Sequence, residues 1–196
     1  MSHVSSRGDT IIEVLLAVTI FSLVAVGGVS VMNQGLAIAQ RALEIDLVRM
    51  QMDTQADLLR FISSQSISDS QPTEPGSWRE KWEKIIDNPG MGSVQKFDDM
   101  VDSNGVTCKL PSNKFALSTS QSALIRADPF VRPVTQADTY AMISDSAAKG
   151  IWIQGIKDSA NGTDFYDFHI RACWNTSGQS RPITLGTIVR LYAPAQ

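Results

Sequence analysis

The chain is poor in the residues that metal sites and most catalytic centres use. Its 196 residues contain only two cysteines, Cys108 and Cys173, and only two histidines. Two cysteines are too few for a disulfide-rich scaffold, and these two lie too far apart for a CxxC motif. The sequence also has no Ser/His/Asp order, metal-ligand spacing or phosphate-binding loop. We therefore predict no catalytic residues, no cofactor-binding residues, no metal ligands and no enzyme activity.

The chain also lacks net positive charge. Its net charge is −3 and its isoelectric point is near 5.3. Because nucleic-acid-binding surfaces carry clustered lysine and arginine, no nucleic-acid partner is evident. The hydrophobic content of 43% is ordinary for a folded protein, and the 13 glycines and 8 prolines are too few to indicate disorder. The length suits one domain with an appendage.

A long uncharged run stands near the N-terminus. Residues 14–32 hold no charged side chain, and at 1.5 Å per residue this run would cross about 30 Å of hydrocarbon. Eight short, mostly polar residues with one positive charge, at Arg7, precede it. Glu13 lies at the edge of the run. A carboxylate in hydrocarbon is costly unless it is paired, so Glu13 indicates a functional role with a partner group.

Two simpler interpretations of this segment are a secretory signal peptide and a signal anchor. The apolar run is longer than the roughly 7–15 residues usual for a signal peptide, and no convincing cleavage site follows it. A signal anchor accommodates the length of the run. It gives no reason for Glu13.

Residues 8–15, GDTIIEVL, resemble the class III signal of type IV prepilins and the related pseudopilins. That pattern is a short basic leader ending in Gly, a variable residue, a small or polar one, two aliphatic residues, Glu and a long apolar helix. The resemblance implies that a prepilin peptidase cleaves between Gly8 and Asp9 and methylates the new N-terminal Asp9. Glycine suits this position because it lets the scissile backbone approach catalytic groups closely. Asp9 departs from the family's usual Phe or Met.

The resemblance also implies a role for Glu13. As the fifth residue of the mature chain, its carboxylate would meet the N-terminal amine of a neighbouring subunit and fix the register between subunits. The implied partners are the peptidase, other pilin subunits, membrane lipid, and a membrane assembly platform with its ATPase motor. The implied location is the cytoplasmic membrane of a prokaryote as a single-pass protein, and then a cell-surface or extracytoplasmic pilus.

The function that this resemblance implies is a structural subunit of a type IV pilus-like filament. The length and irregular middle of the chain favour a minor pilin. A pseudopilin of a type II secretion system and a subunit of a DNA-uptake pilus share the same motifs. An alternative from another class is a signal-anchored extracytoplasmic enzyme or binding domain.

The predicted fold class is α+β, with a long N-terminal helix packed on a C-terminal antiparallel sheet. The predicted parts are a leader (1–8), a membrane or filament-core helix (9–32), an amphipathic helix (33–62) and an extracytoplasmic globular domain (63–196). On the amphipathic helix, two sets of apolar residues follow helical spacing. We expect one side to pack on the sheet and the other to face sister helices. The sets are Leu36, Leu43, Leu47, Met50, Leu58 and Phe61, and beside them Ile38, Ile45, Met52 and Leu59.

The rest of the chain is predicted as a loop (63–78), a short helix within 79–92 and a mixed region up to Gly150. In that region we expect short strands at 106–109 and 114–118 and a helical piece at 140–148. The C-terminal part reads as strands at 151–156, 164–174 and 183–193, the last two joined in an antiparallel hairpin. The apolar register of the second strand is predicted to face the core: Tyr166, Phe168, Ile170, Ala172 and Trp174.

An extracytoplasmic domain permits a disulfide, and we favour one between Cys108 and Cys173 over two buried thiols. A bond closing about 65 residues would stabilise the fold by about 4 kcal/mol in the chain-entropy model. His169 lies on the polar register of its strand and is predicted to be solvated rather than catalytic. Four tryptophans are expected to anchor the core or an interface: Trp78, Trp82, Trp152 and Trp174.

Overall fold

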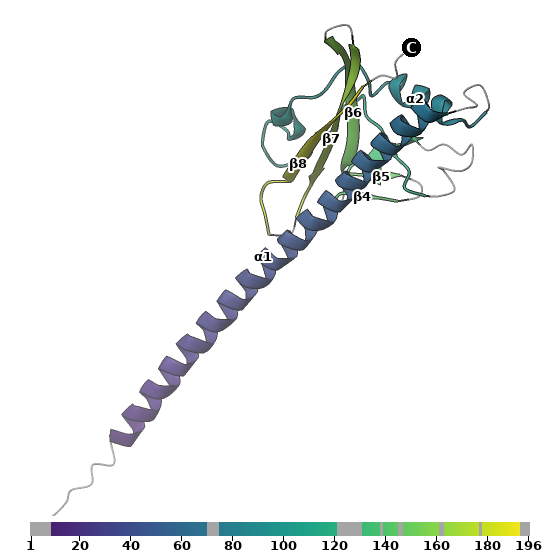
Figure 1. The fold of residues 1–196 in the computed structure, drawn as a ribbon. Helices are drawn as coiled ribbons and strands as arrows, with labels where there is room; N and C mark the ends of the chain where they lie inside the picture. The colour runs from purple at the N-terminus through teal and green to yellow at the C-terminus, as the bar shows by residue number, and fades with distance from the viewer. Residues whose placement is uncertain are drawn as a thin grey trace, which may run out of the picture. The chain divides into compact units, whose positions relative to one another are not determined.

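A computed structural model describes residues 9–69, 75–120, 131–137, 139–144, 147–160, 163–176 and 178–192. In element order it has helices α1 and α2, a 3-10 helix and strands β1 to β8 (Figure 1). Its contacts divide the chain into two compact units, Met1–Leu43 and Glu44–Gln196.

Helix α1 spans Asp9–Ser68 and belongs to both units. No proline interrupts these 60 residues, and the helix continues through Gly27 and Gly28. It ends six residues beyond the predicted end at 62. The helix therefore includes serines of the predicted loop (63–78). Ser64 and Ser66 donate their hydroxyls to carbonyls three residues earlier, over 2.8 and 2.7 Å.

The main sheet is antiparallel, with strand order β6-β7-β8. Its strands are β6 (Ile151–Ala160), β7 (Thr163–Trp174) and β8 (Ile183–Tyr192), seen in green to yellow in Figure 1. The register pairs Trp174 with Ile183, as in the predicted hairpin. A long N-terminal helix with this C-terminal sheet confirms the predicted α+β fold.

The core of the 44–196 unit lies between the second half of α1 and one face of this sheet. The apolar register of β7 is buried as predicted, including Phe168 and Trp174. Full burial of one such side chain is worth about 1.5–3 kcal/mol relative to exposure. One stripe of α1 contributes to the same core: Val48, Met52, Ala56, Leu59 and Ile62.

Helix α2 (Trp78–Ile86) completes this core. Its N-cap, Ser77, accepts a hydrogen bond from the Glu80 N–H, which satisfies one of the free donors of the first turn. Trp82 packs edge-on against Tyr166 of β7 with ring centroids 5.6 Å apart. The helix begins one residue before the segment 79–92 in which a short helix was predicted. It ends before Pro89, which disfavours helical backbone in the residue before it.

The region between α2 and β6 holds a 3-10 helix (Phe97–Met100) and two small sheets. The first sheet pairs β1 (Ala116–Leu117) with β2 (Val131–Arg132). The second has the order β3-β5-β4, from Val134–Thr135, Ala148–Lys149 and Met142–Ile143.

Two local predictions for this region were wrong. Residues 140–148 were expected to be helical, but their described part contains β4 and the first residue of β5. The N–H and the hydroxyl of Ser144 both donate to the Ala147 carbonyl, an alternative to the helical ladder. In place of a strand at 106–109 the structure has an isolated bridge between Cys108 and Val101.

Cys108 and Cys173 are joined by a disulfide, with Cα atoms 5.8 Å apart. It links the middle region to β7, and both cysteines are buried. Trp82, Trp152 and Trp174 are buried as expected, and Trp78 is half-buried.

Candidate functional site

The first candidate site is the apolar part of α1. One helix in the described chain is long and apolar enough to cross a membrane, and it lies near the N-terminus. Every described side chain from Thr10 to Leu43 is exposed. Monomeric soluble proteins rarely leave so much contiguous apolar surface exposed. This surface therefore needs an apolar environment, either lipid or other protein.

Glu13 lies one turn inside α1, four residues after Asp9. Its side chain is exposed, and within the described ranges no side-chain hydrogen bond or ion pair reaches it. Gly8 lies outside the described residues, and Asp9 is the first residue of α1. Asp9 of the predicted cleavage pair, and Glu13, for which a charged partner was predicted, thus both lie at the N-terminal end of this apolar helix.

Two other polar side chains of this segment, unlike Glu13, form hydrogen bonds within the helix. Thr19 donates its hydroxyl to the Leu15 carbonyl over 2.7 Å, and Ser22 donates to the Val18 carbonyl over 2.7 Å. These bonds satisfy each hydroxyl inside the helix itself, so the residues need no outside partner in hydrocarbon. Glu13 makes no such bond within the part of the chain that the structure describes.

Gly27 and Gly28 leave an open place on the helix surface. A Cβ atom added at either residue would have no neighbour within 4 Å. α1 is helical through both residues, so the pair does not unwind the helix. The open surface there would admit the close approach of another helix.

In the 44–196 unit, α1 carries apolar residues on two sides. Met52 is 4% exposed and packs in the core, whereas Met50 is 63% exposed. The same contrast separates buried Leu59 from Phe61. A two-residue step is about 200° around a helix, so the exposed residues lie on the side away from the core. Within this unit the exposed stripe is Leu47, Met50 and Phe61. The two predicted sets do not separate cleanly, because Leu58 of the first set and Ile45 of the second both pack partly against the core.

His169 is half-buried on the face of β7 opposite the α1 core. Burial is the main cause that lowers the pKa of His169, and the neighbouring charge of Arg171 lowers it further. No cluster of three or more His, Cys, Asp or Glu side chains suited to a metal occurs in the described part of the chain. His169 therefore belongs to no such cluster among the described residues.

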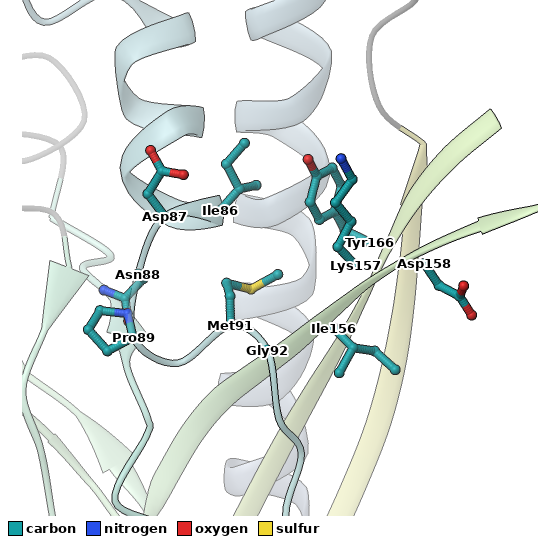
Figure 2. Close-up of a pocket in the computed structure, with 10 residues that line it drawn as sticks. All are labelled: Ile86, Asp87, Asn88, Pro89, Met91, Gly92, Ile156, Lys157, Asp158 and Tyr166. Atoms are coloured by element: carbon teal, nitrogen blue, oxygen red, sulfur yellow. The ribbon is translucent and has the colours of Figure 1, made fainter. Parts of the chain in front are cut away.

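Sequence reasoning missed a cavity of about 900 Å³ beside the end of α2 (Figure 2). Its walls come from Ile86 and Asp87, from Met91 in the following turn, and from Lys157 and Tyr166 of the sheet. These residues are up to 80 positions apart and belong to no shared motif, so the sequence carries no signal for the cavity.

No protein-family model, no curated protein and no solved structure matches this chain. Its function has to be inferred from its own residues and their geometry.

Proposed function

We propose that the chain is a structural subunit, in the role of a minor pilin, of a type IV pilus-like filament. The observation that carries this proposal is the fully exposed apolar half of α1 with Glu13 close to its start. A helix with this surface is stable in a membrane and equally in a bundle of like helices. The role is assembly, and it requires no catalytic group.

Processing comes first in this proposal. A prepilin peptidase removes residues 1–8, and the new amine at Asp9 is methylated. Before assembly the mature subunit spans the cytoplasmic membrane through residues 9–32, surrounded by lipid. An assembly platform and its ATPase motor then move the subunit from the membrane into the filament.

In this proposal, Glu13 fixes the axial register between neighbouring subunits. A carboxylate in hydrocarbon is costly by itself, and a neighbouring subunit's N-terminal amine compensates its charge. Such a pair forms only at one axial offset between two helices. The internal hydrogen bonds of Thr19 and Ser22 support this reading, because they show how a hydroxyl in this segment is satisfied within the helix, which the Glu13 carboxylate is not.

The two-sided helix supports the same proposal. The core side of α1 holds the sheet of its own subunit through residues such as Met52 and Leu59. The opposite side leaves Leu47, Met50 and Phe61 exposed in the isolated chain. Packing against sister helices covers this second stripe, and the open surface at Gly27 and Gly28 allows close approach.

The deciding experiment is mass spectrometry of the N-terminus, on the membrane fraction and on filaments sheared from cells. A chain beginning at Asp9 in the sheared fraction is expected, and its mass reports methylation. The Gly8→Ala variant is expected to stay unprocessed. Normal cleavage of that variant, or a chain that retains residues 1–8 and occurs only in membranes, would refute the proposal.

Glu13→Val tests the assembly role separately. The variant is expected to be cleaved normally but to be depleted from sheared filaments. Thr19→Val is the matched control, because it also replaces a polar residue in the same apolar segment, one whose hydroxyl is already satisfied. Equal recovery of both variants in filaments would contradict the role of Glu13.

A further inference from the structure

The cavity beside α2 adjoins the edge of the main sheet that strand β6 forms. It lies within the 44–196 unit, between the end of α2 and strand β6 (Figure 2). Strand β6 is one edge of the sheet, since β7 pairs with it on one side only. The backbone groups on its other side are available to other segments.

Two segments of the same chain already use this edge. The Ile153 N–H donates to the Phe115 carbonyl over 2.7 Å and its carbonyl accepts from the Phe115 N–H over 3.2 Å. Two residues further along β6, Gly155 bonds in the same way with Gly90 and Gly92, over 3.0 and 2.8 Å. Main-chain groups alternate in direction along a strand. The N–H and C=O groups of the odd-numbered residues of β6 therefore point away from β7.

Lys157 is the next outward-facing residue, and it lines the cavity. Among the described residues, no main-chain group bonds to the N–H or C=O of Lys157 on the side away from β7. At Ser159 the outward N–H is already taken by the carboxylate of Asp158, over 2.8 Å. The exposed pairing position therefore lies at Lys157, directly beside an open space. Unpaired edge groups of this kind accept extended peptide segments.

The charge around the cavity favours a basic side chain. The C-terminal end of α2 and its C-cap, Asp87, both present negative charge there. The ammonium of Lys157 is neutralised by the carboxylate of Asp164, over 2.7 Å, so Lys157 adds no net positive charge at the cavity. The local balance is therefore negative.

The walls suit the long apolar stem of such a side chain. Ile86 and Met91 are aliphatic walls, and Tyr166 offers an aromatic ring (Figure 2). The stem of an arginine or lysine packs on apolar surface while its head remains near charge and water. An aromatic ring also attracts a cation above its face.

We propose that this cavity receives the basic side chain of an extended segment from a partner protein, which adds to β6 by main-chain hydrogen bonds at Lys157. The main-chain bonds supply the direction of the segment, and the cavity selects the side chain. This binding site is separate from the helix surface used in assembly, so either proposal can fail without the other.

The test measures binding of a fluorescein-labelled peptide, acetyl-Thr-Val-Arg-Val-Thr-amide, to the full chain in detergent micelles by fluorescence anisotropy. The matched probe replaces the central Arg by Glu. Saturable binding of the Arg peptide is expected, with the Glu peptide weaker by at least about tenfold in Kd. Equal binding of the two peptides, or no saturable binding of the Arg peptide, would overturn the proposal.

Three variants separate the backbone contribution from the charge contribution. Lys157→Pro removes the outward N–H at an edge position that tolerates proline, and is expected to raise Kd at least about tenfold. Lys157→Gln keeps the N–H and is expected to retain binding. Asp87→Asn changes only an exposed side chain and is expected to weaken the Arg peptide by about threefold or more. Unchanged binding in both the proline and asparagine variants, with native circular dichroism, contradicts the site.

Discussion

The indole N–H of Trp174 donates a hydrogen bond to the carboxylate of Glu44, with 3.1 Å between Nε1 and Oε2. The two residues are 130 positions apart in sequence. Trp174 ends β7, and Glu44 lies where α1 begins to contribute to the core of the 44–196 unit. The bond therefore ties the last residue of the central strand to the start of the packed part of the helix.

Trp174→Phe is expected to lower the free energy of unfolding by about 1–2 kcal/mol, because it removes this donor and part of a buried ring. Glu44→Gln keeps an acceptor oxygen and is expected to cost less than about 1 kcal/mol. Guanidinium unfolding of the full chain in mild detergent, followed by circular dichroism, gives both values. A larger loss in the Gln variant would show that charge, rather than the hydrogen bond, dominates the contact.

Met50→Ser and Met52→Ser form a matched pair on α1. Met50 is exposed, so its replacement is expected to change stability by less than about 0.5 kcal/mol while reducing incorporation into filaments. Met52 is in the core, and its replacement is expected to cost about 2–5 kcal/mol. Unfolding curves and the amount of subunit in sheared filaments measure the two effects. Normal incorporation of Met50→Ser would remove the exposed stripe from the assembly surface.

The ion pair between Asp167 and Arg190 predicts a pH dependence. Two hydrogen bonds of 2.7 Å from the guanidinium hold the pKa of the Asp167 carboxyl below its usual value. A lowered folded-state pKa stabilises the fold above the unfolded-state pKa of about 3.9, and that stability is lost as pH falls through the folded-state pKa.

Arg190→Gln is therefore expected to be less stable than the parent chain near neutral pH, with the difference narrowing below about pH 4. Thermal unfolding across a series of acidic buffers measures this convergence. A stability difference that stays constant down to the acid transition would mean that the pair acts through packing, such as the contact of Arg190 with the Phe165 ring 4.1 Å away.

Loss of the disulfide is expected to destabilise the 44–196 unit. The bond closes a separation of 65 residues, which corresponds to about 4 kcal/mol of chain entropy. The double variant Cys108→Ser and Cys173→Ser should lose an amount of that order, plus the cost of burying a hydroxyl at Cys173. Replacing both residues by alanine is the control for the hydroxyl. Equal stability of the alanine variant and the parent chain would contradict the prediction.

The sequence predicted the parts of the fold that depend on periodic burial. The alternation along residues 164–174 identified the buried face of β7, and the uncharged run identified the apolar helix. These patterns are strong because each repeats over several turns or several strand residues. Among the short segments, the helix near 79–92 and the strand within 114–118 were predicted, whereas the predictions for 106–109 and 140–148 were wrong. In residues 140–148, one serine side chain and pairing with a distant strand outweighed local helix propensity.

For the candidate sites, the predicted cleavage motif and the predicted role of Glu13 come from the sequence alone, because their residues are contiguous. It could not decide which apolar residues of α1 face the sheet. That choice depends on where distant groups bind the helix, as with buried Gln55, whose amide exchanges two hydrogen bonds with the Leu117 backbone, over 2.7 and 2.9 Å. The cavity at Lys157 could not be predicted for the same reason, because residues far apart in the sequence line it.

By itself, then, the sequence determined an apolar helix with a carboxylate near its start and an alternating C-terminal sheet, because local spacing dictates which side chains share a face. Only the tertiary structure decided which stripe of α1 is buried, which position of the β6 edge stays unpaired, and that Asp87 and Tyr166 line one cavity. Those features arise when segments far apart in the chain compete for the same backbone groups and the same apolar surface.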